Sequence, residues 1–291
     1  MNLKNIIAII QARMGSSRLP GKVLQDIADR PMLVRVVERV KRAKTISQVV
    51  VASTSDASDD EIQKLCLKKG YICYRGSHYD VLDRYYQAAC LYHADIIVRI
   101  TGDCPLIDPG LIDLTVNAFL GKRIIINDHT RRKFQWDFVT NRLPPPWHRT
   151  YPIGLDTEVC SFEALERAWS NARLPYHREH VMTYLYEPER AHIYSSLGKI
   201  PPNLNPADNP FHVLVIDHEP DYGMYRWTVD TAEDLALIRQ IYAHFPGRDD
   251  FTWREVIALF KKHPELISIN QQVEHKTALD IDHRILDQVQ S

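Results

Sequence analysis

Short apolar segments alternate with amphipathic segments along the first 120 residues of the chain. Four apolar runs predict strands, because each is short and bounded by polar or turn-forming residues: "NIIAIIQA", "QVVVAST", "YICYRG" and "DIIVRIT". Strands that alternate with helices are typical of βαβ units around a mainly parallel sheet flanked by helices. We therefore predict an α/β fold whose functional residues lie at the carboxyl ends of the strands.

The segments between these strands carry start and stop signals for helices. Pro31 opens the first helix, within "PMLVRVVERVKRA". The second helix is predicted to begin with Ser58 as its N-cap, to have Glu61 at the capping-box position and to stop at Gly70. Further helices are predicted in "DVLDRYYQAACLYH" and "DPGLIDLTVNAFLG".

The alternation ends near residue 121, where proline-rich segments begin. They predict irregular structure, with helices between them in "CSFEALERAWSNA" and "REHVMTYLYE". A strand in "FHVLVID" follows, and "MYRWTVDTAEDLALIRQIYAHF" predicts a strand end, an acidic N-cap and a helix. We predict one domain at residues 1–245, with an irregular region at about 121–215, and a helical extension at 246–291 packed on it.

The composition excludes several classes of protein. Lys plus Arg number 36 and Asp plus Glu number 37, so a net charge of −1 gives no general field for nucleic acid. No apolar run approaches the roughly 18 residues that a membrane span needs, and the N-terminus lacks a signal cleavage site, so we expect a cytoplasmic protein. The five cysteines form no CxxC pair, which argues against a zinc site or a disulfide framework.

A basic turn follows the first predicted strand. The segment "QARMGSSRLPGK" carries Arg13, Arg18 and Lys22 among glycine, serine and proline. It is not a Walker A loop, because Gly15 and Gly21 enclose five residues and a valine follows the lysine, and it lacks the glycines of GxGxxG. Such a turn can present backbone N–H groups and cations to a triphosphate, or it can be a solvated basic loop.

Two aspartates are candidate partners of this turn. Asp103 follows a buried strand in "RITGDCPLIDP", and Asp230 follows a second predicted strand end in "RWTVDTAEDL". Either could be a helix cap, although Thr231 and Asp234 satisfy the capping box near Asp230 without it. If the two strands are neighbours, both carboxylates can hold Mg²⁺, which prefers a few carboxylates together with phosphate oxygens. A cationic turn with two such carboxylates predicts nucleotidyl transfer.

Five motifs in order resemble the cytidylyltransferases that activate sugar acids, including the 3-deoxy-manno-octulosonate and acylneuraminate enzymes. They are "IIAIIQARMGSSRLPGKVL", "VVVAST", "DVLDRYY", "RITGDCPLIDP" and "WTVDTAEDLALI". The chain is most similar to the branch that serves spore-coat polysaccharide biosynthesis. This resemblance implies a Rossmann-like nucleotide-diphospho-sugar transferase fold, CTP as donor, Mg²⁺, and transfer of CMP with release of pyrophosphate for surface polysaccharide biosynthesis. It also implies a homodimer.

The resemblance assigns roles to residues by position. Arg13, Lys22, Asp103 and Asp230 would be catalytic, and the two aspartates would hold the metal. Thr101 stands where the octulosonate enzymes carry Gln, so the choice of base at that side chain is open. The expected nucleotide-binding residues are Ala12, Arg13, Gly15, Ser16, Ser17, Arg18, Lys22, Thr54, Arg84, Thr101 and Asp103.

The acceptor is expected over the sheet, beside the irregular region. Arg178 suits a carboxylate or phosphate, and Asp156 or Glu158 can accept hydrogen bonds from sugar hydroxyls. Tyr151 and Trp227 complete this expected acceptor-binding set, with Trp227 facing the pocket. The "HREH" segment around Arg178 can equally be an ordinary helix start, and its spacing does not suit zinc.

Two other functions compete with nucleotidyl transfer. A glycosyltransferase of related fold would use an intact nucleotide sugar and usually carries an Asp-x-Asp motif, whereas "TGDCP" supplies one aspartate. A non-catalytic nucleotide-binding protein would not need both carboxylates and all three cations. The sequence therefore favours an enzyme that binds CTP and a small sugar-acid or phosphorylated acceptor.

Overall fold

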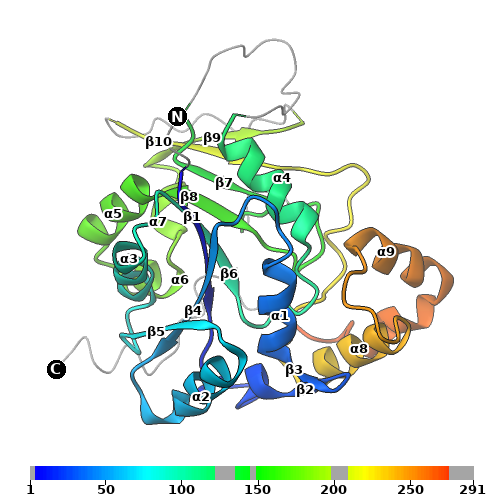
Figure 1. Cartoon of the computed structure of the whole chain (residues 1–291). Helices are drawn as coiled ribbons and strands as arrows, with labels where there is room; N and C mark the ends of the chain where they lie inside the picture. Colours follow the sequence, from blue (N-terminus) through cyan, green and yellow to red (C-terminus); the bar gives the residue numbers. More distant parts are fainter. Residues whose placement is uncertain (1–3, 122–134, 145–148, 198–208, 275–291) are drawn as a thin grey trace.

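An eight-stranded β-sheet with helices on both faces runs through the middle of the protein in this computed structural model (Figure 1). The structure describes residues 4–121, 135–144, 149–197 and 209–274. The strand order is β5-β4-β1-β6-β8-β7-β10-β9, and only β8 runs antiparallel to its neighbours. The strands are β1 (Ile6–Gln11), β4 (Gln48–Thr54), β5 (Ile72–Gly76), β6 (Ile96–Thr101), β7 (Phe138–Thr140), β8 (Glu158–Ser161), β9 (Ala191–Ser195) and β10 (Phe211–Val215). The predicted α/β class is confirmed.

The helices lie on both sides of this sheet, and a short hairpin stands apart from it. The α-helices are α1 (Met32–Val40), α2 (Asp60–Lys69), α3 (Val81–Leu91), α4 (Pro109–Phe119), α5 (Phe162–Asn171), α6 (Pro175–His180), α7 (Thr183–Tyr186), α8 (Ala232–Ala243) and α9 (Trp253–Lys262). The hairpin and the 3-10 helices are β2 (Asp26–Ile27), β3 (Arg30–Pro31), η1 (Lys22–Leu24), η2 (Ala57–Asp59) and η3 (Pro264–Ile269).

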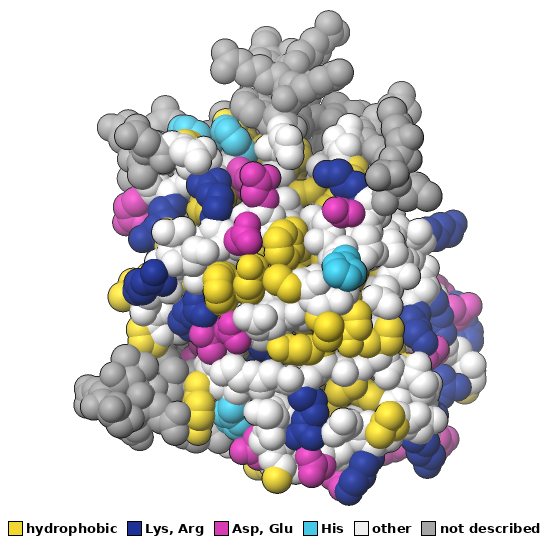
Figure 2. All heavy atoms as spheres, turned by 60° about the vertical axis from the view of Figure 1, so that its left-hand side comes forward, with side chains coloured by type: hydrophobic (Ala, Val, Ile, Leu, Met, Phe, Trp, Pro, Cys, Tyr) yellow, Lys and Arg dark blue, Asp and Glu magenta, His cyan; other side chains and the backbone are white. Residues whose placement is uncertain are grey.

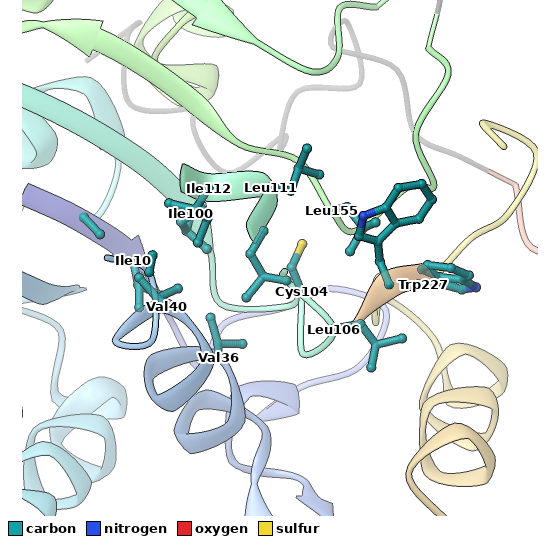
Figure 3. Packing of buried hydrophobic residues seen from close by; sticks show 14 of the residues in the cluster. Ile10, Val36, Val40, Ile100, Cys104, Leu106, Leu111, Ile112, Leu155 and Trp227 are labelled. Carbon is teal, nitrogen blue, oxygen red and sulfur yellow. The ribbon is translucent and has the colours of Figure 1, made fainter. Parts of the chain in front are cut away.

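Alternate side chains of β1 supply two separate cores, because successive residues of a strand face opposite sides of a sheet. Ile10 packs in the core that α1, α4, α8 and α9 cover, and Ile9 packs in the core under α3 and α5. Figure 3 shows Val36 and Val40 of α1 facing Ile10 in the first core. Both faces of β1 are therefore buried, which explains its uninterrupted apolar run.

The start of α2 differs from its prediction. Ser58 does not cap it, because the Asp56 side chain accepts the Ser58 N–H and starts the 3-10 turn η2 first. The helix itself begins at Asp60 and ends, as predicted, at Gly70, which adopts a left-handed conformation with φ of 67°.

Three strands that the sequence did not predict, β7, β8 and β9, lie in the region predicted to be irregular, together with β10, which it did predict. β7 and β9 were missed, because three to five residues are too few to show a period. β8 pairs antiparallel with β6 and β7, and α5 begins only after it, with Ser161 as N-cap. The strand end predicted before Asp230 is also wrong, since only an isolated bridge joins Ile153 and Arg226 there.

The C-terminal segment packs into the first core through α9. Trp253 and Phe260 lie in that cluster with residues of α1 and α4, and residues 275–291 of the predicted extension lie outside the described residues. Within the described part of the chain, no helix has the length and apolar character that crossing a membrane requires. On the face shown in Figure 2, Lys and Arg side chains lie interspersed with Asp and Glu, in keeping with the balanced charge.

A buried arginine ties α1 to this C-terminal segment. Arg39 is 1% exposed and donates to the carbonyl oxygens of Ile107, Asp249 and Phe251 at 2.8, 2.9 and 2.8 Å. Its guanidinium also lies over the Phe251 ring. Removing it takes this donor from the buried carbonyl groups of Ile107 and Phe251, whereas the Asp249 carbonyl still accepts from Arg42.

We predict that Arg39→Met lowers the free energy of unfolding by about 3–5 kcal/mol, the cost of breaking a buried charged network. Urea unfolding followed by circular dichroism measures this loss. Arg248→Met removes exposed ion pairs to Asp250 and Glu255 and a contact with the Phe245 ring, and it should cost less than about 1 kcal/mol. Equal losses in the two variants would contradict a special role for Arg39.

Candidate active site

The ammonium group of Lys22 lies between the two predicted metal ligands. Its Nζ is 2.8 Å from Asp103 Oδ2, 2.8 Å from Asp230 Oδ1 and 2.8 Å from the carbonyl oxygen of Val229. An ammonium has three N–H donors, so all three are satisfied. The two aspartates therefore converge on one cation, although they are far apart in the sequence.

Main-chain contacts, not neighbouring strands, bring Asp103 and Asp230 together. The Val229 N–H donates to the Asp103 carbonyl at 2.9 Å, and the Thr228 hydroxyl donates to the same oxygen at 3.2 Å. Before Asp103, a Cβ on Gly102 would lie 2.9 Å from the Gln11 carbonyl oxygen, so the turn after β6 can approach β1 only with glycine.

Asp230 is surrounded by positive charge. Arg18 Nη2 lies 3.0 Å from its Oδ2, and Arg226 Nη2 lies 2.8 Å from the same oxygen. Burial alone would raise the pKa of Asp230, but Lys22, Arg18 and Arg226 lower it to about 2. Burial alone would lower the pKa of Lys22, but the two aspartates raise it. Both groups are thus held in their charged forms.

Arg226 was missed by the sequence analysis. This buried side chain also binds Asp234 at 2.9 and 3.0 Å, and Asp234 accepts the Thr231 N–H in the predicted capping box. The cap of α8 therefore orients Arg226 toward Asp230. An arginine four residues before Asp230 was the available signal.

The basic turn is closed by its own hydrogen bonds. The Met14 carbonyl accepts the N–H groups of Ser16 and Gly21, each at 2.9 Å, and Leu19 N–H donates to the Ser16 hydroxyl. These N–H groups are used inside the turn, so the expectation that its backbone presents consecutive donors to an anion is wrong for them.

Asp59, also missed, fastens this turn to the end of β4. Its Oδ1 accepts the Met14 N–H at 2.7 Å, and its Oδ2 accepts the hydroxyl groups of Ser53 and Thr54 at 3.1 and 2.5 Å. Asp59 is 1% exposed, and Thr54 is fully buried. The structure therefore gives the Thr54 hydroxyl a partner within the protein.

The cations of the turn have different surroundings. Arg18 and Lys22 form ion pairs with Asp230, whereas Arg13 lies near Arg84 and His78. Burial lowers the pKa values of Arg84 and His78, and the positive charge of Arg13 lowers them further. The pKa of Arg84 falls to about 10. Arg84 is 2% exposed, and its Nε and Nη1 have no hydrogen-bond partner among the described residues. An acceptor from a ligand would satisfy them.

The other nucleotide candidates lie around this centre. Ala12 is buried at the end of β1, where its N–H donates to the Ala52 carbonyl. Gly15 and Ser17 belong to the basic turn, and Ser17 is exposed. The Thr101 hydroxyl lies 3.1 Å from Cys104 Sγ. The structure thus groups these residues at the carboxyl ends of β1 and β6.

Three acceptor candidates lie in the interior. Trp227 is fully buried between Tyr225 and Phe260, so it does not face an acceptor; Figure 3 shows its ring in the core beyond Leu106. Tyr151 is 3% exposed and packs against Trp253. Glu158 is buried in β8, where it pairs with Arg99 of the neighbouring strand. Burial and this ion pair remove them from contact with a sugar.

Asp156 lies near Cys104, the residue that follows Asp103. Segment 153–156 runs beside segment 225–228, because Ile153 forms main-chain hydrogen bonds with Tyr225 and Trp227. Burial raises the pKa of Cys104, and the negative charges of Asp103 and Asp156 raise it further. The carboxylate of Asp156 binds Arg149 at 2.6 and 3.1 Å and lies 3.4 Å from Arg142.

Arg178 is placed elsewhere, beside α3. It binds Asp80, the N-cap of α3, at 2.8 Å and donates to the Trp169 carbonyl. A guanidinium with these partners has a role within the fold, which agrees with the alternative that "HREH" is an ordinary helix segment.

The ion pairs of Asp230 predict an acid-dependent stability. Because its folded-state pKa lies below the ordinary value of 3.8, its ion pairs stabilise the fold above that pH and are lost as pH falls through about 2. We expect wild type to exceed Asp230→Asn in free energy of unfolding at pH 7, with the difference narrowing between about pH 4 and 2.

Urea unfolding at a series of pH values measures this difference. The exposed Glu163→Gln serves as control and should show no comparable pH-dependent difference from wild type. A gap between wild type and Asp230→Asn that stays constant down to pH 2 would show that Asp230 does not titrate as its contacts indicate.

Comparison with known proteins relates this chain to cytidylyltransferases. Residues 7–244 match a family model described as cytidylyltransferase. The spore coat polysaccharide biosynthesis protein SpsF of Bacillus subtilis is 29% identical over 268 residues, covering 90% of this chain and 97% of that protein. A 3-deoxy-manno-octulosonate cytidylyltransferase of Geobacter sulfurreducens is 44% identical over 111 residues, 38% of this chain and 43% of that protein.

Solved structures show the same fold. A cytidylyltransferase from Leptospira borgpetersenii has a TM-score of 0.75 and 34% identity, covering 94% of this chain and 100% of that chain. A CMP:2-keto-3-deoxy-manno-octonic acid synthetase complexed with CTP has a TM-score of 0.52 and 18% identity, over 83% of this chain and 99% of that chain. The predicted Rossmann-like fold is confirmed.

Proposed function

The chain belongs to the cytidylyltransferase family, and from this we propose that it transfers CMP from CTP to a sugar acid or a related sugar or polyol phosphate, releasing pyrophosphate. The product would serve surface polysaccharide biosynthesis, as the name of the Bacillus relative suggests. The observation that carries the proposal is the meeting of Lys22, Asp103 and Asp230 beside the basic turn after β1.

The residues present fit Mg²⁺. Asp103 and Asp230 already place one carboxylate oxygen each within 2.8 Å of a single positive centre. Among the described residues there is no group of three or more His, Cys, Asp or Glu side chains that could hold a metal. A site of two carboxylates suits Mg²⁺, because phosphate oxygens and water complete its coordination. When bound, the ion would neutralise charge on the triphosphate.

The protein's own groups would position the triphosphate and stabilise its charge. An acceptor oxygen, either of a phosphate that is already ionised or of a hydroxyl that loses its proton to water, forms a bond to the α-phosphorus. The bond from that phosphorus to the oxygen bridging the α- and β-phosphates breaks, and pyrophosphate leaves with the bonding electrons. Arg13, Arg18 and Lys22 would lie near the leaving group and stabilise its negative charge. No covalent intermediate with the protein is needed, since positioning and neutralisation supply the catalysis.

Arg84 is the residue we propose for direct recognition of the nucleoside. It is buried next to Arg13 with two nitrogen atoms lacking partners in the described structure, and a cytosine carbonyl or ribose oxygen would accept from them. Asp156 with Arg149 remains our candidate for the acceptor side, because Asp156 lies near Cys104, the residue that follows Asp103. We further propose a cytoplasmic homodimer that binds neither nucleic acid nor membrane.

Pyrophosphate release tests the function. The protein is incubated with each of the four common ribonucleoside triphosphates, Mg²⁺ and a panel of sugar acids, sugar phosphates and polyol phosphates, and mass spectrometry identifies products. CTP should give the fastest release. Asp103→Ala should reduce turnover by about 100-fold or more, while the exposed Glu163→Ala retains it. No release with any triphosphate, or turnover only of intact nucleotide sugars, would refute the proposal.

Arg84→Met separates ligand binding from folding. Losing a charge-assisted hydrogen bond should weaken CTP binding by about 1.5–3 kcal/mol, measured by isothermal titration calorimetry. The melting temperature of the free protein should stay unchanged or rise, because the variant removes a buried charge whose nitrogens lack partners. Unchanged CTP affinity together with a lower melting temperature would make Arg84 a structural residue instead.

A further inference from the structure

Lys22 lies where a metal bound to both aspartates would have to lie. Its Nζ contacts one oxygen of Asp103, one of Asp230 and the Val229 carbonyl, and the side chain is 10% exposed. Mg²⁺ binds such oxygens at about 2.1 Å. An ammonium and a divalent ion sharing the same oxygens would repel each other at close range, so they cannot both be held between the two carboxylates.

The charges around this position already balance. Lys22, Arg18 and Arg226 carry three positive charges, and the carboxylates they contact, Asp103, Asp230 and Asp234, carry three negative charges. Adding a divalent ion alone would leave an excess of two positive charges in a poorly solvated place. Adding it with a triphosphate restores the balance, since the phosphates bring negative charge and new acceptors for Lys22.

Lys22 also has the means to move. It is the first residue of η1, directly after Gly21, whose φ of 69° closes the basic turn. Its four-carbon side chain can carry the ammonium to phosphate oxygens over that turn without movement of the sheet. Arg18 and Arg226 both contact Oδ2 of Asp230, whereas Lys22 contacts Oδ1, so the ammonium is the group that lies between the two aspartates.

We propose that Lys22 is an internal cation that excludes a divalent metal from the Asp103–Asp230 pair until a triphosphate binds and draws the ammonium away. This inference rests on the proposed function and adds to it a coupling: metal and nucleotide enter together, and each raises the affinity of the other by the same factor. Until then, the ammonium of Lys22 offsets the electrostatic repulsion between the two carboxylates.

Binding of Mn²⁺ without nucleotide tests this coupling directly. Free Mn²⁺ is measured by electron paramagnetic resonance with wild type, Lys22→Met and Arg18→Met. We expect Lys22→Met to bind Mn²⁺ at least about tenfold more tightly than wild type, within the usual range of coupling between sites. Arg18→Met removes the same charge from Asp230 but leaves Lys22 in place, so it should change the affinity much less. Adding Asp103→Asn to Lys22→Met should abolish the gain.

A measurement on wild type keeps the test independent of how the variants fold. CTP should raise the affinity of the protein for Mn²⁺, after correction for Mn²⁺ bound to free CTP. CMP should not, because it lacks the β- and γ-phosphates that draw Lys22 away. Tight Mn²⁺ binding to wild type without nucleotide, or equal gains in Lys22→Met and Arg18→Met, would overturn the inference. Such results would leave CTP-dependent pyrophosphate release intact, so the failure of this inference and the failure of the proposed function are distinguishable.

Discussion

The nearly buried ammonium group of Lys22 must have hydrogen-bond acceptors, and this requirement determines how the candidate active site is assembled. Lys22 follows the basic turn after β1, and its three partners come from residues 81, 207 and 208 positions later in the chain. A buried ammonium without acceptors would be strongly unfavourable, so the turn, the loop after β6 and the segment before α8 must meet. The site and the fold are therefore stabilised by the same contacts.

The scaffold around this group is mostly backbone. Gly102 lets the loop after β6 approach β1, and the Val229 N–H binds the Asp103 carbonyl beside it. Asp59 fixes the basic turn to the end of β4. Side chains that touch a substrate can then act from rigid positions, which is what a reaction catalysed by positioning and charge requires.

The positive side chains of the site differ in how their hydrogen-bond donors are used. Arg18, Lys22 and Arg226 form ion pairs with carboxylates, whereas two nitrogens of Arg84 lack hydrogen-bond partners within the described residues. A nucleotide can supply acceptors to Arg84 and phosphates to Arg18 and Lys22. This difference explains how one ligand could both satisfy Arg84 and release Lys22 from the aspartates.

The sequence by itself determined the alternating strands and helices of the first 120 residues, the basic turn and both aspartates, because periodicity, caps and turn residues are local properties. Only the tertiary structure decided that Trp227 and Glu158 are buried, that β7 to β9 complete the sheet, and that Lys22 lies between Asp103 and Asp230. These features depend on contacts between segments distant in the chain, and no local pattern records which distant partner will neutralise a given charge.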